Sequence, residues 1–410
     1  MSSNHQVRAR AKAHQCRVQA SGWNPEVRGW LETLIAKGSG RGLPVVFDFD
    51  NTLICGDVSE VTLATLVNSG LLPLEHLAPT LSPPFRPPGG TRITLESCHD
   101  IAEYYEAFLT PSAHGGSDPS PFSNGYVWAV EVMEGLRPLD VIRATRAAYQ
   151  QPQPSRPAFV EVTPGKTVFP IPFFYPEMVE LMAELLRHDF EVWIVSAGNV
   201  WSMRWMILEV LNPMLRQLGV SQALRADHLL GVSTLLADHK DRLYKDALLV
   251  RDHPGYAALD ERALAAFRLT SRLQFPVPAY SGKVACLFDA LGRNPYLCIG
   301  DSPGDHAMMT ISQHRLWIAR IERPSFQRKL LDWIRKNGSA NWMVQPTLTR
   351  AMPGFVPDWS EIVRRLGSLS AEVRETRRIL NQVASLTRRA RSRGSALKAS
   401  AGMSLIGDRA

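Results

Sequence analysis

Long apolar runs and paired cysteines are both scarce in this sequence of 410 residues. The stretch FPIPFFYP is broken by three prolines, and no other segment has the uninterrupted apolar length that a membrane-spanning helix needs. The five cysteines are odd in number and none forms a CxxC pair, so the sequence predicts neither a disulfide framework nor a zinc site. We therefore expect a cytoplasmic protein without a membrane span.

The middle of the chain also has no excess of basic residues. Residues 1–20 contain four basic side chains and no acidic one, and residues 374–410 contain nine basic against two acidic side chains, so the formal charge of +7 comes from the two ends. Such runs are usually solvated. We predict a disordered basic arm at 1–20 and a basic, helical or disordered tail at 371–410. Because no nucleic-acid-binding motif accompanies them, we do not expect nucleic acid as a partner.

Strands and helices alternate through most of the remaining chain, which favours an α/β fold with a parallel sheet. A short buried strand ends near residue 47, a β-branched and aromatic strand ends at Ser196, and a third strand precedes Asp301. Amphipathic helical patterns fill the region after the first strand. We predict a first core part at 21–56, a helical cap at 57–160 and a second core part at 161–370, with a strand-rich excursion at about 221–280.

Acidic and hydroxyl side chains follow these predicted strands directly. Ligands of parallel α/β sheets bind beyond the carboxyl ends of the strands, so we expect these groups to meet at one edge. Clustered carboxylates repel one another unless a cation lies between them, and a set of oxygen ligands suits Mg²⁺. The residues concerned are Asp48, Asp50, Thr52, Ser196, Asp301 and Asp305, with Lys283 opening the helix before the last strand.

The segments FDFDNT, VWIVSAGN, YSGK and CIGDSPGD, in this order, resemble the four motifs of the haloacid dehalogenase (HAD) superfamily of phosphoryl-transfer enzymes. The resemblance spans residues 47–305. It implies a three-layer Rossmann-like core. The helical insertion after the first motif is similar to the C1-type cap of the phosphoserine phosphatase-like branch, and such a cap favours a small-molecule phosphate ester as substrate.

The resemblance also implies a role for each motif residue. Asp48 would attack phosphorus and become an aspartyl phosphate, and Asp50 would exchange protons with the leaving group and with water. Lys283 would balance the negative charge. The remaining expected roles are phosphate binding by Thr52, Ser196 and Ala197, and Mg²⁺ binding by Asp48, the main-chain carbonyl of Asp50, Asp301 and Asp305. Asp50 points to a phosphatase or a mutase rather than a dehalogenase, and hydrolysis of a phosphomonoester is the leading hypothesis.

The identity of the substrate stays open at this stage. The texture of the cap is nearest to phosphorylcholine phosphatase-like proteins, in which Glu60 would face the choline cation. Carboxylates and aromatic rings would suit such a head group, and Glu60, Glu96, Tyr104, Tyr105 and Trp128 offer them, whereas Asp57 stands where phosphoserine phosphatases have a substrate-binding Glu; each is at least as compatible with packing. A phosphoserine-like ester is the alternative. A phosphotransferase using the same site, or an anion-binding protein acting through its basic ends, are other hypotheses. The oligomeric state is not indicated.

Overall fold

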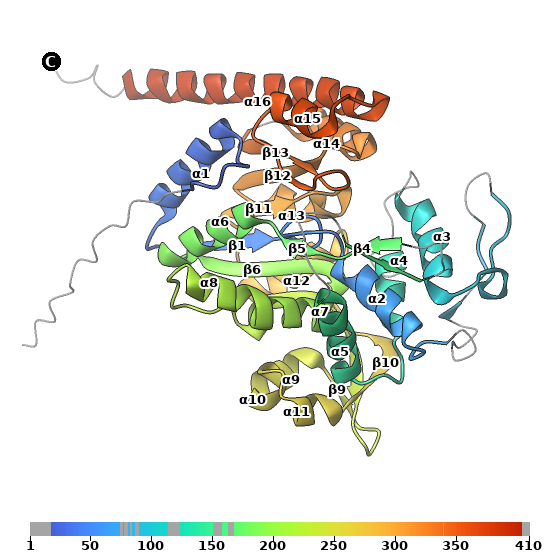
Figure 1. Ribbon diagram of the computed structural model, residues 1–410. Coiled ribbons are helices and arrows are strands. Elements are labelled where there is room, and N and C mark those ends of the chain that lie inside the picture. Colours follow the sequence, from blue (N-terminus) through green and yellow to red (C-terminus); the bar gives the residue numbers. More distant parts are fainter. Residues whose placement is uncertain are drawn as a thin grey trace, which may run out of the picture.

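The computed structural model describes residues 18–73, 77, 81–82, 84–86, 90–113, 124–150, 158–162, 168–338 and 340–403, with backbone only for 110–113 and 391–403. A seven-stranded sheet forms its centre, in the order β14-β13-β12-β11-β1-β6-β7 (Figure 1). Neighbouring strands are parallel except β13 and β14, which confirms the predicted α/β core. The strands are β1 (Pro44–Phe47), β6 (Glu191–Asn199), β7 (Leu229–Val232), β11 (Leu297–Gly300), β12 (His314–Arg320), β13 (Trp342–Leu348) and β14 (Gly354–Phe355).

Helices cover both faces of this sheet. Successive side chains of a strand point to opposite faces, so Val45 and Phe47 join one apolar cluster while Val46 joins another. The first cluster includes residues of α1 (Pro25–Gly38) and α6 (Pro176–Arg187). The second includes residues of α12 (Gly282–Leu291), α13 (His306–Ile311) and α14 (Pro324–Asn337). Burial on both faces explains why these strands are nearly continuous apolar runs.

A helical insertion separates β1 from β6. Its two ends are joined by an antiparallel pair, β2 (Ile54–Cys55) and β5 (Phe173–Phe174), so the chain leaves and re-enters the core at one place. Between them lie α2 (Val58–Asn68), the 3₁₀ turn Leu95–Ser97, α3 (Ile101–Ala113), α4 (Gly125–Glu131), α5 (Pro138–Tyr149), and the paired strands β3 (Phe159–Glu161) and β4 (Val168–Pro170). The chain therefore re-enters the core at β5, later than residue 160, where we expected the cap to end.

The segment 221–280 is hydrogen-bonded to this insertion. Its β8 (Thr234–Ala237), β9 (Leu243–Tyr244) and β10 (Arg268–Leu273) form a small antiparallel sheet. Leu269 of β10 donates a backbone hydrogen bond to Leu136 O (2.7 Å) and accepts one from Gly135 N (2.9 Å), both in the insertion. We expected a strand-rich excursion, but half of the segment's elements are helical: the 3₁₀ turn Ala226–His228, α9 (Asp246–Asp252), α10 (Pro254–Ala257) and α11 (Glu261–Ala265).

A helical run after β6 anchors the same segment through a buried ion pair. The run consists of α7 (Val200–Trp205), a π-helical turn (Met206–Leu211) and α8 (Asn212–Gln217). Arg204, 1% exposed, forms hydrogen bonds of 3.1 and 2.7 Å with both carboxylate oxygens of Asp246. Tyr256 donates a further bond of 2.6 Å to that carboxylate. The buried charge of Arg204 in the helical run is thus neutralised mainly by Asp246 of the segment 221–280.

Replacing Asp246 with Asn should lower the free energy of unfolding by about 3–5 kcal/mol, because the variant leaves the Arg204 charge buried without its partner. Urea denaturation measures this change. The control is Glu261→Gln, which breaks an ion pair with Arg143 in which both side chains are more than half exposed; its cost should stay within about 1 kcal/mol. Equal, small losses in both variants would show that the buried pair contributes no more than a surface pair.

The two ends of the described chain pack onto the body. Val18 is buried, and the backbone N–H groups of Gln19 and Ala20 donate to the carboxylate of Glu180 on α6. This corrects the expectation of disorder for residues 18–20, because the side chain of Val18 is buried and a partly buried carboxylate accepts from the backbone of residues 19 and 20. Residues 1–17 and 404–410 of the predicted arm and tail lie outside the described residues.

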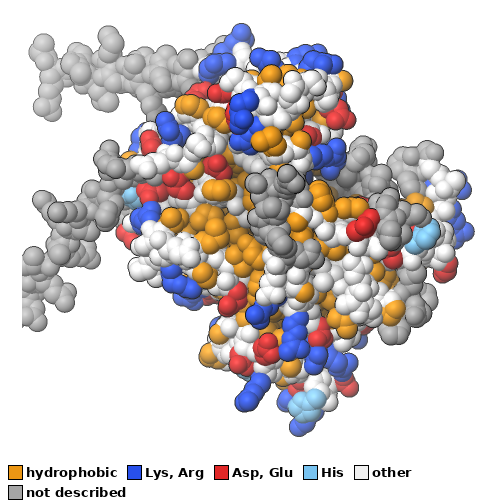
Figure 2. Space-filling model, viewed as in Figure 1, with side chains coloured by type: hydrophobic (Ala, Val, Ile, Leu, Met, Phe, Trp, Pro, Cys, Tyr) orange, Lys and Arg blue, Asp and Glu red, His pale blue; other side chains and the backbone are white. Residues whose placement is uncertain are grey.

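The last helix, α16 (Ala371–Met403), packs on α14, and α15 (Trp359–Leu366) lies beside them (Figure 1). The four residues that suggested an amphipathic helix in this tail are buried: Val373, Thr376, Leu380 and Val383. On the face drawn in Figure 2, basic and acidic side chains are interspersed over most of the surface. No helix of the described chain has the length and hydropathy needed to cross a membrane.

Candidate active site

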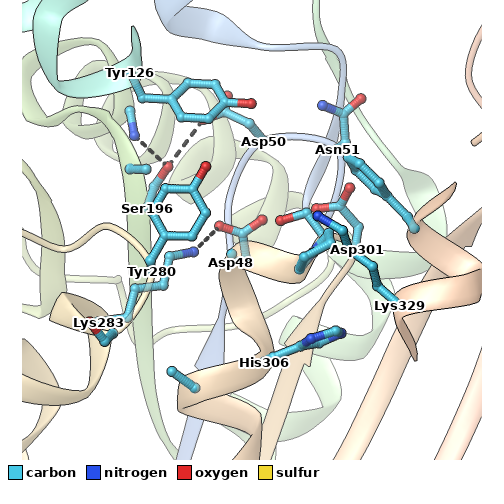
Figure 3. Close-up of a pocket in the computed structure, with 18 of the residues that line it drawn as sticks. Asp48, Asp50, Asn51, Tyr126, Ser196, Tyr280, Lys283, Asp301, His306 and Lys329 are labelled. Atoms are coloured by element: carbon cyan, nitrogen blue, oxygen red, sulfur yellow. Dashed lines mark hydrogen bonds and ion pairs between the residues drawn. The ribbon is translucent and has the colours of Figure 1, made fainter. Parts of the chain in front are cut away.

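Three neighbouring strands, β11, β1 and β6, bring the predicted motif residues to one edge of the sheet. Asp48 follows β1 and Asp301 follows β11, while Ser196 lies in the last part of β6. They line a cavity of about 570 Å³, together with Asp50 and Lys283 (Figure 3). Parallel strands end at the same edge, so Asp48 and Asp301, more than 250 positions apart in the chain, meet here.

Asp48 is held by a cation on one carboxylate oxygen and by a hydroxyl on the other. Lys283 Nζ donates to its Oδ1 (2.7 Å) and Thr52 Oγ1 donates to its Oδ2 (3.0 Å). Burial and then the charge of Asp305 raise the pKa of Asp48, Lys283 opposes the shift, and the net result is a pKa of about 6. The carboxylate is therefore fixed in orientation and faces a cavity in which it is only 6% exposed.

Lys283 bridges two acids from different strands. Its Nζ donates to Asp48 (2.7 Å) and to Asp305 Oδ1 (2.6 Å). Burial by itself lowers the pKa of Lys283, but the charges of Asp305 and Asp48 outweigh burial and raise the pKa above its usual value. Asp305 Oδ2 accepts from the backbone N–H groups of Asp301 (3.1 Å) and Ser302 (3.0 Å). The lysine thus stays charged beside Asp48.

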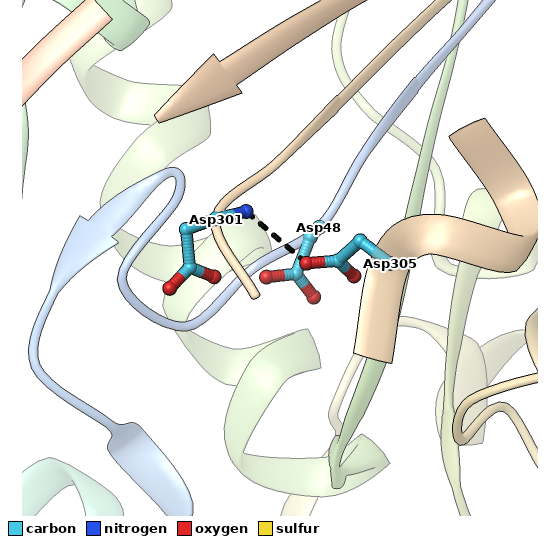
Figure 4. A group of neighbouring side chains, drawn as sticks. All are labelled: Asp48, Asp301 and Asp305. Atoms are coloured by element: carbon cyan, nitrogen blue, oxygen red, sulfur yellow. Dashed lines mark hydrogen bonds between the residues drawn. The ribbon is translucent and has the colours of Figure 1, made fainter. Parts of the chain in front are cut away.

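A divalent cation fits the cluster of acids at this edge. Asp48, Asp301 and Asp305 each offer a carboxylate oxygen, and these three atoms lie within 4.8 Å of one another (Figure 4). Burial raises the pKa of Asp301 well above its usual range; Arg320 opposes the shift, and the charges of Asp48 and Asp305 add to it. Three buried carboxylates with an all-oxygen donor set suit a hard cation. The side chain of Asp50 is not part of this cluster.

Asp50 stands on the other side of the site, next to Ser196. Its Oδ2 accepts from Ser196 Oγ (3.1 Å) and its Oδ1 accepts from the backbone N–H of Val58 (2.9 Å). Burial and then the charge of Asp57 raise the pKa of Asp50 well above its usual range, against the hydrogen bond from Val58. A carboxyl group whose pKa is raised is suited to protonating a leaving group.

Gly198 leaves room for this pair. A Cβ at position 198 would lie 2.8 Å from Asp50 Oδ2 and 2.7 Å from Ser59 Oγ, closer than a methyl group can approach. The backbone N–H of Gly198 donates to Ser196 Oγ (2.9 Å). We expected the strand to end at Ser196, but β6 continues to Asn199, and this extension carries Ala197 and Gly198 along the cavity wall.

Thr52 lies in a different place from the one we expected. It is fully buried and does not line the cavity, and its hydroxyl contacts Asp48 and Asp301 (3.3 Å to Oδ1). The turn after β1 folds back on itself through a hydrogen bond from Thr52 N to Phe49 O (3.2 Å), which points the side chain under the carboxylates. Its geometry favours holding the two acids rather than a phosphate oxygen.

The cap residues suggested by the sequence separate into two groups. Tyr104, Tyr105 and Trp128 pack with Phe85 and Phe108 as the aromatic core of the insertion, and Glu96 is exposed outside the cavity. Asp57 lines the cavity and caps α2 by accepting from Ser59 N and Glu60 N. Glu60, one turn into α2, lies 3.5 Å from the hydroxyl of Tyr105 and does not line the cavity.

Several residues of the cavity wall were missed in the sequence. They are Asn51, Tyr126, Tyr280, His306, Arg320 and Lys329. Tyr280 is the first residue of the YSGK segment, and Arg320 ends the apolar run LWIAR, as the motif acids end theirs. These two sequence contexts could have identified Tyr280 and Arg320 as cavity residues. Tyr126 belongs to α4 of the insertion, where nothing in the sequence distinguishes a cavity residue from a packed one.

Comparisons with known proteins agree with this geometry. No family model matches the chain. The phosphorylcholine phosphatase of Pseudomonas aeruginosa is 23% identical over 335 residues, which cover 78% of this chain and 86% of the relative. A conserved Anaerococcus prevotii protein of unknown function has a similar fold, with a TM-score of 0.52, 17% identity, and coverage of 82% of this chain and 96% of that one. A substrate-bound phosphoserine phosphatase superposes with a TM-score of 0.35, which is too low to support an argument.

The alignment with the Pseudomonas phosphatase covers 86% of that relative. The four motif segments of this chain converge on one cavity with the acids, hydroxyl and lysine that phosphoryl transfer requires. The chain is thus similar to a phosphatase over most of its length, and its cavity holds the groups expected from the haloacid dehalogenase motifs that it resembles.

Proposed function

We propose that this protein hydrolyses a small organic phosphomonoester with Mg²⁺ as cofactor, through an aspartyl phosphate formed on Asp48, and that phosphocholine is the leading candidate substrate. The observation that carries the proposal is the Asp48–Lys283–Asp305 arrangement at the cavity floor, with Asp50 and Ser196 beside it. A buried carboxylate paired with a lysine and next to a proton-bearing acid suits nucleophilic attack on phosphorus.

The proposed reaction has two steps. Asp48 attacks phosphorus, the bond to the ester oxygen breaks, and that oxygen takes the proton of Asp50 as the alcohol leaves. Water then attacks the aspartyl phosphate, Asp50 takes a proton from this water, and the bond between phosphorus and Asp48 breaks to release inorganic phosphate. Ser196 Oγ, 3.1 Å from Asp50, and the backbone around Gly198 orient the groups on this side.

Mg²⁺ would be held by Asp48 and Asp301, with Asp305 as a third oxygen donor or as their support. When bound, such a cation neutralises charge on the phosphoryl group. Lys283 itself neutralises part of the negative charge of Asp48 and Asp305. Phosphoryl transfer depends mainly on positioning and charge neutralisation, and these side chains supply both.

A cationic leaving group is supported by two features besides the Pseudomonas relative. Asp57 and Glu60 are acids near the cavity that have no basic group within 4 Å among the described residues. Tyr126 and Tyr280 line the cavity, and the pKa of Tyr126 is raised by burial, by Tyr280 and by the charge of Glu60. Carboxylates behind aromatic rings are suited to a quaternary ammonium group.

A panel of phosphate esters tests the proposal. The purified protein should release inorganic phosphate from an aryl phosphate in the presence of Mg²⁺, lose this activity in a chelator, and regain it when Mg²⁺ is restored. Among phosphocholine, phosphoethanolamine, phosphoserine and a sugar phosphate, phosphocholine should have the highest kcat/KM. Turnover of none of these esters with any divalent cation would contradict the enzymatic proposal, and a preference for phosphoserine would contradict only the choice of substrate.

Glu60→Gln should lower kcat/KM for phosphocholine about tenfold, the size expected when a negative charge behind the cavity wall is lost, and leave kcat/KM for an aryl phosphate without a cationic group within about twofold. The physical reason is that the amide keeps the shape of Glu60 but cannot balance the ammonium charge. Steady-state kinetics on both esters measure the difference. Glu103→Gln, a partly exposed glutamate of α3 in the same insertion, is the matched control. Equal losses on both esters would assign Glu60 to packing.

A further inference from the structure

Arg320 is the last residue of β12, next to β11 in the sheet, so it stands at the same edge as the motif residues. It lines the cavity, and its side chain is 13% exposed. Its guanidinium carbon lies 5.0 Å from the ring centre of Phe326, which also lines the cavity. None of the four motif segments includes Arg320, and no step of the proposed reaction has used it.

The contacts of Arg320 leave part of its guanidinium free. Its Nε lies 2.7 Å from Asp301 Oδ2 as an ion pair, although the two atoms do not meet with hydrogen-bond geometry. Within the described chain, its two terminal nitrogens have no hydrogen-bond partner and no second carboxylate lies within 4 Å. An arginine that is mostly buried and keeps unused N–H donors on a cavity wall is suited to binding an oxyanion in its planar fork.

Arg320 and Lys283 approach Asp48 from opposite sides. Lys283 contacts Asp48 Oδ1 directly, whereas Arg320 contacts Asp301, which shares the Thr52 hydroxyl with Asp48 Oδ2. Figure 3 shows Lys283 and Asp301 on opposite sides of Asp48. The two basic side chains together balance two of the three clustered acids. With a divalent cation added, the floor of the site would carry a net positive charge, which favours a dianionic phosphoryl group.

We propose that Arg320 is a substrate-binding residue, whose terminal N–H groups bind a phosphoryl oxygen while its Nε stays on Asp301. The inference rests on the proposed function and deepens it, because it adds a second cationic group for the phosphoryl oxygens. Arg320 would then have two roles, binding of the oxyanion and positioning of Asp301.

Inorganic phosphate is the probe, titrated calorimetrically into the full-length protein at saturating Mg²⁺, and Mg²⁺ is titrated separately. Arg320→Met should weaken phosphate binding about 10- to 100-fold, as expected for loss of a hydrogen bond between charged groups. The control is Arg323→Met, the same substitution at a partly buried arginine that does not line the cavity, and it should leave phosphate affinity within about twofold of wild type. Unchanged phosphate affinity in Arg320→Met, with or without weaker Mg²⁺ binding, would overturn the proposal.

Arg320→Lys keeps the test decisive if the methionine variant does not fold, as judged by its thermal transition. A lysine has no fork and cannot hold Asp301 and a phosphoryl oxygen as arginine does, so phosphate affinity should fall about tenfold; wild-type affinity would overturn the proposal. Measurements on the wild-type protein distinguish failure of this inference from failure of the proposed function. If it hydrolyses an aryl phosphate and binds phosphate while the Arg320 variants bind equally well, only this inference fails. Absence of hydrolysis in the wild type contradicts the proposed function instead.

Discussion

Asp48→Asn should lower kcat for an aryl phosphate by at least about 10³-fold, because the amide oxygen is a poor nucleophile. The substitution is nearly isosteric, and the hydrogen bond from Thr52 to one side-chain oxygen can persist. The contact with Lys283 loses its ionic partner on Asp48 but retains the one on Asp305. We therefore expect a folded protein that is inactive.

Steady-state turnover and trapping of a phosphoenzyme with a radiolabelled ester measure this effect. Asp252→Asn is the matched control, because this aspartate is 59% exposed and pairs only with its neighbour Arg251 in the described chain. The control should label and turn over as the wild type does. Normal turnover in Asp48→Asn would show that phosphorus is attacked by another group, and the proposed mechanism would then be wrong.

Asp50→Asn should produce a loss of about 10²- to 10⁴-fold for esters of alkyl alcohols, the range expected for removing a general acid. An alkoxide leaves poorly without a proton, whereas a nitrophenolate leaves without one, so the first step should be much less affected with a nitrophenyl ester. Water activation also depends on Asp50, so the phosphoenzyme should accumulate. A burst of nitrophenol followed by slow turnover is the expected time course.

The affinity of Mg²⁺ provides the control within the same variant. The Asp50 side chain lies outside the Asp48–Asp301–Asp305 cluster and bonds to Ser196 and to the backbone of Val58. Mg²⁺ binding should therefore stay within about twofold of wild type, since nothing in the cluster is removed. A parallel loss of Mg²⁺ binding, or an equal loss for alkyl and aryl esters, would exclude a role for Asp50 in proton transfer.

The domain organisation illustrates the limits of local sequence patterns. Helices of the insertion follow from their amphipathic spacing, but its closing pair of strands, β2 and β5, joins segments some 120 residues apart. The backbone hydrogen bond between Gly135 and Leu269 also joins segments that are far apart in the sequence. Pairing of this kind depends on which loops the core brings together, and two-residue strands carry no periodicity of their own.

The amino-acid sequence by itself determined the α/β core and the groups Asp48, Asp50, Ser196, Lys283, Asp301 and Asp305, because an apolar run that ends in a polar group at the right spacing is a local signal. Tertiary structure alone decided that Thr52 lies beneath the carboxylates, that Ser196 lies within its strand, and that Arg320 reaches Asp301. The physical reason is that these relations depend on strand order and on the path of turns. Both arise from long-range packing, which neighbouring residues do not encode.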